Sequence, residues 1–397
     1  PWQDVAAMVE ALSAYEARRA ERPLLARTRA KNASGSAAGG ATAAPIASVS
    51  EEDWAFCKQA LAEVSRTFSK PIAMLPGNLE VAVTLGYLLC RIADTVEDHP
   101  SVETESRDRL FPMFLDVLEK GVDAAPFERE FEAIEGDDPE LSLARRTRMV
   151  MRVFHAQSAR TQAACIEWVS EMARGMSLYS KRRKGEDGFI ALHTTADLER
   201  YCYYVAGTVG HLLTDLFLEE LGEAKESELG LRLREDAESF ASGLQMVNIL
   251  KDVTDDRERA WSFIPRTAVA RQGLGIPELC DESVRARAHA AVAPLFDVAR
   301  GHLDGALRYA LAIPTSQPGI RLFCLLPLWM AARTLVVGRG NDAMFVAGAP
   351  VKISREEVES IVAECVRCVG DDDALRARYA RLYEGEAPMR RATATPA

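Results

Sequence analysis

Apolar positions recur with helical spacing along nearly the whole chain from residue 48 onward. The longest such patterns run over residues 146–181, 196–221, 230–260 and 279–311, and segments rich in Gly, Pro and Asp separate the long patterns. There is no sustained strand alternation, no glycine fingerprint that opens a βαβ unit and no internal repeat. The pattern predicts an all-α protein, a single large helical bundle with a central cavity.

The chain divides into four predicted segments. Residues 1–30 have the composition of a helix, and residues 31–47 are mostly Ala, Gly and Ser, which is typical of a flexible linker. The main domain is predicted over 48–385, with a helix start at Ser50 and the acidic residues that follow it. Residues 386–397 are predicted to be a disordered tail.

The composition limits the classes of molecule that the protein is expected to bind. A formal net charge of −11 in 397 residues argues against nucleic acid, which requires a basic face. The eight cysteines lie mostly in apolar helical context, as reduced thiols of a cytoplasmic protein do. The apolar stretch 322–332 is short and contains Pro327, so it predicts a core helix and no transmembrane segment. Peripheral membrane contact and the oligomeric state are left open.

Two short acidic clusters interrupt apolar helical stretches. Asp94 and Asp98 are four positions apart, as are Asp252 and Asp256, so each pair shares one helix face. Like charges at this spacing weaken a helix. Mg²⁺ prefers carboxylate oxygens and completes its shell with substrate phosphates. The clusters therefore predict two facing helices that hold magnesium and diphosphate, and the alternative is a pair of solvated acidic faces.

Other polar groups are compatible with the same chemistry. Residues 65–69, Ser-Arg-Thr-Phe-Ser, offer a guanidinium and hydroxyls suited to a leaving diphosphate. Arg91 lies on the same helix side as Asp94, where it can pair with its acidic neighbours, bind diphosphate, or do both. Three tyrosines enter the segment 201–210, whose glycines indicate either close helix packing or a cavity wall.

In this order and spacing, segments 65–68, 94–98, 201–210 and 248–256 resemble the squalene/phytoene synthase family over roughly residues 50–340. Segment 323–335 and, less closely, 351–354 resemble the squalene-forming branch. The resemblance implies an all-α isoprenoid-synthase fold, with Mg²⁺ and prenyl diphosphate substrates. It also implies head-to-head condensation of two farnesyl diphosphates through a cyclopropylcarbinyl diphosphate, and NADPH-dependent reduction to squalene.

The same resemblance assigns roles to individual residues. Asp94, Asp98, Asp252 and Asp256 would bind the metal, and Tyr201 would assist proton removal. The residues that would contact substrate are Ser65, Arg66, Phe68, Arg91, Gln245 and Asn248. NADPH would contact Asn248 and Lys352. Two other outcomes stay open: a non-reducing phytoene or dehydrosqualene synthase, and a pseudoenzyme acting as an assembly factor, which the four aspartates disfavour.

The chain departs from the family pattern at three positions. Lys251 stands where an arginine commonly precedes the second acidic cluster, and a lysine lacks the bidentate fork of a guanidinium. Trp261 stands where an arginine usually follows that cluster, with Arg257 and Arg259 nearby. Ser354 replaces a second basic residue after Lys352, which weakens the nicotinamide assignment.

Overall fold

A computed structural model of the chain describes residues 50–65 and 68–384. The predicted N-terminal helix, the linker, the tail 386–397 and Arg66 lie outside these residues. The predicted all-α fold class is confirmed.

The α-helices of the first half are α2 (Glu51–Val64), α3 (Ser69–Ala73), α4 (Gly77–Asp98), α5 (Thr104–Lys120), α6 (Ala125–Glu132), α7 (Pro139–Ala144), α8 (Thr147–His155) and α9 (Ala159–Ser180). Those of the second half are α10 (Thr195–Cys202), α11 (Thr208–Glu220), α12 (Glu228–Lys251), α13 (Val253–Glu258), α14 (Arg266–Ala270), α15 (Arg285–Ala312), α16 (Pro318–Gly338), α17 (Arg355–Cys368) and α18 (Asp372–Leu382). A π-helical turn, η3 (Tyr203–Gly207), joins α10 to α11, and short 3₁₀ turns span Ile276–Glu278, Glu282–Val284 and Asp342–Phe345. The strands β1 (Ile190–Ala191) and β2 (Trp261–Ser262) pair in parallel.

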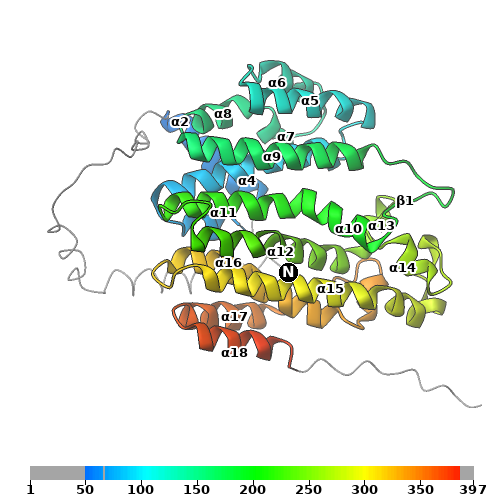
Figure 1. Cartoon of the computed structure of the whole chain (residues 1–397). Coiled ribbons are helices and arrows are strands. Elements are labelled where there is room, and N and C mark those ends of the chain that lie inside the picture. Colours follow the sequence, from blue (N-terminus) through cyan, green and yellow to red (C-terminus); the bar gives the residue numbers. More distant parts are fainter. Residues whose placement is uncertain (1–49, 66–67, 385–397) are drawn as a thin grey trace, which may run out of the picture.

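The long helices lie side by side in stacked rows, with α5 to α8 along one edge of the bundle and α17 and α18 along the opposite edge (Figure 1). Helices α4, α9, α11, α12, α15 and α16 form the interior, and α12 packs most extensively against α15. This arrangement brings the carboxyl end of α4 toward the carboxyl end of α12, so the two acidic clusters meet at one end of the bundle.

Capping residues set several helix boundaries. The Oγ of Ser50 accepts a hydrogen bond from the Asp53 amide at 3.4 Å, which begins α2 where the sequence predicts a helix start. The Oγ of Ser158 accepts from the Thr161 amide at 3.0 Å and begins α9. The helical pattern over 146–181 is therefore two helices, α8 and α9. Apolar spacing continued through this break because both helices bury a face against the same core.

The most apolar helix, α16, is a core element. It is the helix among the described residues with the length and composition to cross a membrane, and 83% of its most hydrophobic window is buried inside the bundle. Phe323 and Trp329 on α16 are almost completely buried. This burial agrees with the prediction of a core helix for residues 322–332.

Glycines bring the helices beside the cavity close together. A Cβ added at Gly210 on α11 would lie 2.0 Å from the Ala237 carbonyl oxygen of α12, so no side chain fits there. A Cβ at Gly175 on α9 would lie 2.1 Å from the ring of Tyr204. Both glycines thus serve close packing, which for Gly210 is one of the two interpretations that the sequence leaves open.

Candidate active site

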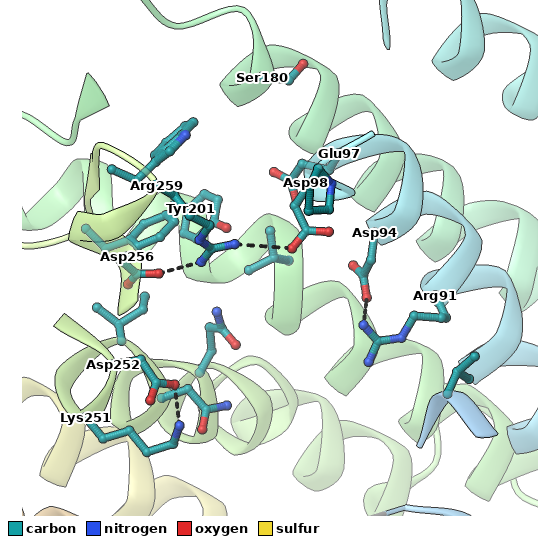
Figure 2. Close-up of a pocket in the computed structure, with 18 of the residues that line it drawn as sticks. Arg91, Asp94, Glu97, Asp98, Ser180, Tyr201, Lys251, Asp252, Asp256 and Arg259 are labelled. Carbon is teal, nitrogen blue, oxygen red and sulfur yellow. Dashed lines mark hydrogen bonds and ion pairs between the residues drawn. The ribbon is translucent and has the colours of Figure 1, made fainter. Parts of the chain in front are cut away.

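A cavity of about 810 Å³ collects the polar residues that the sequence singles out. Its walls come from α4, α10, the carboxyl half of α12 and the residues that follow α2, segments that are far apart in the sequence (Figure 2). The predicted site residues that line it are Ser65, Phe68, Arg91, Asp94, Asp98, Tyr201, Gln245, Asn248, Asp252 and Asp256. Lys352 is exposed and is not part of this lining.

The first acidic cluster occupies the last turns of α4. Asp94 is 3.5 Å from Arg91 Nη1, and Arg91 Nη2 donates to the Tyr87 hydroxyl at 3.1 Å. Burial raises the pKa of Asp94 to about 6, with Arg91 opposing the rise and Asp98 adding to it. Burial and the charges of Asp94 and Asp98 raise the pKa of Glu97 to about 8. The cluster therefore places carboxyl groups close together whose charged forms the fold alone does not fully stabilise.

The second acidic cluster lies at a helix junction. Helix α12 ends at Lys251, and Asp252, with φ −105° and ψ 22°, is both its C-cap and the residue before α13. The pattern over 230–260 is therefore two helices. The Asp256 amide still donates to the Asp252 carbonyl at 3.0 Å, so the turn spacing survives and both carboxylates line the cavity. The break went unpredicted because apolar residues continue across it.

Basic residues neutralise this second cluster. Lys251 forms an ion pair with the adjacent Asp252. Burial raises the pKa of Asp256 to about 6, although its hydrogen bond with Arg259 opposes the rise. Lys251 thus contacts an aspartate of the motif, as a point charge in place of the usual arginine.

Arg259 joins the two clusters. Its Nη2 is 2.6 Å from Asp256 Oδ1, and its Nη1 is 3.6 Å from Asp98 Oδ2 (Figure 2). The guanidinium therefore lies between the aspartates of α4 and α13. This geometry places an arginine near the carboxylates although Trp261 holds the position that the family pattern gives to one. Trp261 also lines the cavity.

Tyr201 lies deep in the cavity wall at the end of α10. It is 7% exposed, stacks on Phe263 with ring centroids 4.7 Å apart, and meets Tyr179 edge to face at 5.1 Å. Burial, and then the charges of nearby acidic groups, raise the pKa of Tyr201 well above its usual value. The phenol is therefore protonated at neutral pH and can donate or relay a proton, whereas a phenolate is disfavoured. The adjacent Tyr203 and Tyr204 do not line the cavity.

Ser65, after the end of α2, and Phe68, before the start of α3, line the cavity together. The Oγ of Ser65 accepts a hydrogen bond from the Phe68 amide at 3.0 Å, which holds Phe68 beside the cavity. On the opposite wall, Gln245 and Asn248 lie on α12, one turn or less apart, and face the same space. Both walls therefore present neutral hydrogen-bonding groups beside the charged clusters.

An apolar pocket of about 180 Å³ adjoins the charged cavity on the side of the bundle interior. Phe68, Tyr87, Arg91, Asp94 and Val205 belong to both spaces. The inner walls come from α9, α11 and α16 and include Met172, Val209, Leu212, Leu213, Leu216 and Phe323. Charged groups thus line one space and hydrocarbon lines the space next to it, which suits a molecule with an anionic head and an apolar chain.

Four charged residues that line the cavity within the described part of the chain are absent from the predicted set: Glu97, Arg107, Lys251 and Arg259. Lys251 was noted in the sequence only as a departure from the family pattern. Glu97 could have been proposed from the sequence, because it lies between the two aspartates of the first cluster. Arg259 is two positions from the expected arginine. Arg107 on α5 belongs to no motif, and only the packing of α5 beside the end of α4 reveals it.

The carboxylates of the cavity suit a metal ion that binds together with a phosphate ligand. Among the residues that the structure describes, no group of three or more His, Cys, Asp or Glu side chains is close enough to hold a metal ion by itself. Mg²⁺ commonly takes one or two carboxylates and completes an octahedral shell with water and substrate phosphates. Carboxylates from α4 on one wall and from the α12–α13 junction on the other match that mode, with room for phosphate between them.

Fold and site together define an all-α synthase of the isoprenoid type. The chain belongs to the squalene/phytoene synthase family, whose sequence pattern matches residues 61–357. It is 29% identical over 298 residues to the squalene synthase of Nicotiana benthamiana, a match that covers 74% of this chain and 66% of that protein. The squalene synthase of Schizosaccharomyces pombe is 27% identical over 329 residues, covering 82% and 67%. The chain thus matches about two thirds of the length of these relatives.

A solved structure shows the same architecture. The complex of TcSQS with the ligand BPH1237 superposes with a TM-score of 0.72 at 26% identity, and the match covers 86% of this chain and 94% of the other. The likeness therefore extends over most of the chain.

Proposed function

We propose that this protein is a Mg²⁺-dependent prenyltransferase that condenses two farnesyl diphosphates head to head and reduces the product to squalene. The observation that carries the proposal is the shape of the site. Two aspartate pairs line a cavity of about 810 Å³, and an apolar pocket that shares five of its wall residues lies beside it. The four relevant carboxylates belong to Asp94, Asp98, Asp252 and Asp256. A prenyl diphosphate has this same polarity, a highly charged head on a hydrocarbon chain.

The charged end of the site would bind and orient the diphosphates. Bound Mg²⁺ would supply Lewis-acid stabilisation of the pyrophosphate that leaves when the allylic carbon–oxygen bond breaks. Arg91 and Arg259 are already within ion-pair distance of the carboxylates. Once the carboxylates are engaged, both guanidinium groups are free to donate hydrogen bonds to phosphate oxygens, which are strong acceptors for them.

The chemistry of the first half-reaction fits the wall residues. The C2–C3 double bond of the second substrate attacks the allylic carbon of the first, and loss of one proton gives the cyclopropylcarbinyl diphosphate and pyrophosphate. Tyr201 is protonated and buried, so its hydroxyl can pass that proton toward the departing pyrophosphate. Phe68, Val205 and Phe263 exclude water, which would otherwise capture a cation.

The reductive second half-reaction is supported by resemblance. Several similar proteins are squalene synthases, and segment 323–335 resembles that branch. Lys352 lies exposed outside the cavity lining. That position favours a second candidate, a non-reducing phytoene or dehydrosqualene synthase, because it leaves no identified partner for the phosphate of NADPH.

One incubation separates these outcomes. Purified protein with Mg²⁺ is given farnesyl or geranylgeranyl diphosphate, with and without NADPH, and the products are identified by mass spectrometry. We expect the cyclopropyl diphosphate or its alcohols from farnesyl diphosphate without NADPH, and squalene with it. Identical products in both arms would assign the non-reducing activity, and no product from either substrate would refute the synthase proposal. Asp252→Asn serves as the control that retains the fold.

Lys352 is tested in the same assay. If it contacts the cofactor, Lys352→Ala raises the KM for NADPH and leaves the first half-reaction unchanged, as loss of a ground-state contact does. An unchanged KM would place the cofactor phosphate elsewhere.

A further inference from the structure

Arg107 differs from the other basic residues of the cavity. Arg91, Lys251 and Arg259 each form an ion pair with an aspartate of the two clusters. Arg107 lines the same cavity from α5, and within residues 50–65 and 68–384 no carboxylate lies at ion-pair distance from it. It is thus a cationic side chain at an anion site without a carboxylate partner.

The guanidinium of Arg107 is held in place but incompletely bonded. Its Nη2 donates to the Val102 carbonyl at 3.2 Å, a contact with the turn between α4 and α5. Its Nε is buried and has no hydrogen-bond partner among the described residues. A buried donor without an acceptor destabilises the fold, and such a group in a native site requires an explanation.

The electrostatic surroundings are consistent with a group prepared for an anion. Burial lowers the pKa of Arg107, while the negative charges of Glu97 and Asp98 oppose that change. These acidic groups are close enough to influence Arg107 but do not form hydrogen bonds with it. An anion brought to the Asp98 end of α4 would therefore meet a charged fork whose Nη1 forms no hydrogen bond within the described residues and is not buried.

We propose that Arg107 binds the diphosphate of one substrate on the α4 side of the cavity, as a positioning residue outside the sequence motifs. The inference rests on the proposed function for the identity of the ligand. It adds α5, which no motif marks, to the elements that hold the substrate. A guanidinium fixed through Val102 presents its remaining N–H groups in a set direction, so it orients the diphosphate as well as attracting it.

The test measures binding of magnesium pyrophosphate by calorimetry, independently of turnover. Arg107→Gln is expected to weaken this binding about 10- to 100-fold, the range for a lost hydrogen bond to a charged group. Arg107→Lys should recover part of the affinity, because it keeps the charge and loses the fork. The matched control is Arg109→Gln on the same helix. Arg109 is 61% exposed and pairs with Glu130, so affinity should stay at the wild-type value.

A melting curve of each variant separates ligand binding from a structural role. If Arg107 only joined α5 to Val102, Arg107→Gln would lower the melting temperature and leave the affinity for magnesium pyrophosphate unchanged, which would overturn the proposal. Wild-type protein that binds pyrophosphate through Arg107 but converts no prenyl diphosphate would refute the proposed function and leave this inference standing. Turnover of prenyl diphosphates at unchanged KM in Arg107→Gln would refute the inference alone.

Discussion

Asp94→Asn should stabilise the protein without ligand and nearly abolish its activity. Burial raises the pKa of Asp94 from 3.8 to about 6, with the attraction of Arg91 already included. At about 1.4 kcal/mol per pH unit this corresponds to about 3 kcal/mol against the charged form. Since the side chain is 32% exposed, solvent screening reduces the cost to about 1–2 kcal/mol. Removing the charge should therefore raise the melting temperature by about 1–4 °C at pH 7–8.

The sign of this effect depends on pH. A carboxyl whose pKa is raised on folding binds more protons in the folded state, so its contribution to stability falls as the pH rises from about 4 to about 6. The gain from Asp94→Asn should be nearly complete once the pH exceeds the folded pKa of about 6, and it should vanish well below pH 3.8, where wild-type Asp94 is protonated in both states. Differential scanning calorimetry across this range, without Mg²⁺, measures it.

Asp94→Asn should lower turnover although it raises the melting temperature. Loss of a metal carboxylate should reduce the rate at least about a hundredfold, equivalent to about 2.7 kcal/mol of barrier. The control is Asp116→Asn, because Asp116 is 47% exposed, pairs with Lys120 on α5 and should affect neither quantity. A variant Asp94→Asn that melts lower and is also inactive would show that Asp94 has a structural role. Near-normal turnover at saturating Mg²⁺ would refute the two-cluster site.

Three further changes test the rest of the site. Asp252→Asn should leave the melting temperature near the wild-type value and reduce turnover at least about a hundredfold. Turnover equal to that of the wild type would show that the second cluster takes no part in the mechanism. Tyr201→Phe should slow formation of the cyclopropyl diphosphate more than it raises KM, whereas Tyr203→Phe, outside the lining, should do neither; single-turnover kinetics with the opposite ranking would exclude Tyr201 as the relay. Phe323→Ala should open the inner pocket, cost about 3–5 kcal/mol of stability and raise the use of geranylgeranyl relative to farnesyl diphosphate. Each additional buried methylene is worth about 0.8 kcal/mol, and an unchanged substrate ratio would show that this pocket does not receive the chain end.

The helical pattern was sufficient to predict the fold class, because a bundle requires only that apolar faces recur at the right period. Boundaries inside long apolar runs were less predictable. At Ser158 and at Asp252 the run continues while the helix ends, since the helices on either side bury their faces against one core. The π-helical turn Tyr203–Gly207 was also not predicted, because its residues are compatible with an ordinary helix. Such turns are frequent at functional sites.

The residues of the candidate site also differ in how well the sequence could predict them. Most site residues could be proposed from sequence because the types and spacing of the motif residues are specific, and the structure brings the proposed residues that it describes to one cavity, except for Lys352. Arg107 could not be proposed, since its role depends on how α5 turns back beside α4. Arg259 could not be distinguished from Arg257 by spacing alone. In the structure Arg259 reaches Asp98 and Asp256, while Arg257 donates to the Ile276 carbonyl at 3.1 Å.

The ion pairs inside the cavity affect how Mg²⁺ and diphosphate would bind. Arg91, Lys251 and Arg259 each occupy an aspartate of the two clusters, so a bare Mg²⁺ ion would have to compete with three cations for its ligands. A magnesium diphosphate complex does not face the same competition. As the metal takes the carboxylates, the displaced guanidinium and ammonium groups gain phosphate oxygens as new partners, so few charges are left unpaired. Mg²⁺ and diphosphate should therefore bind with positive coupling, each raising the affinity for the other by the same factor.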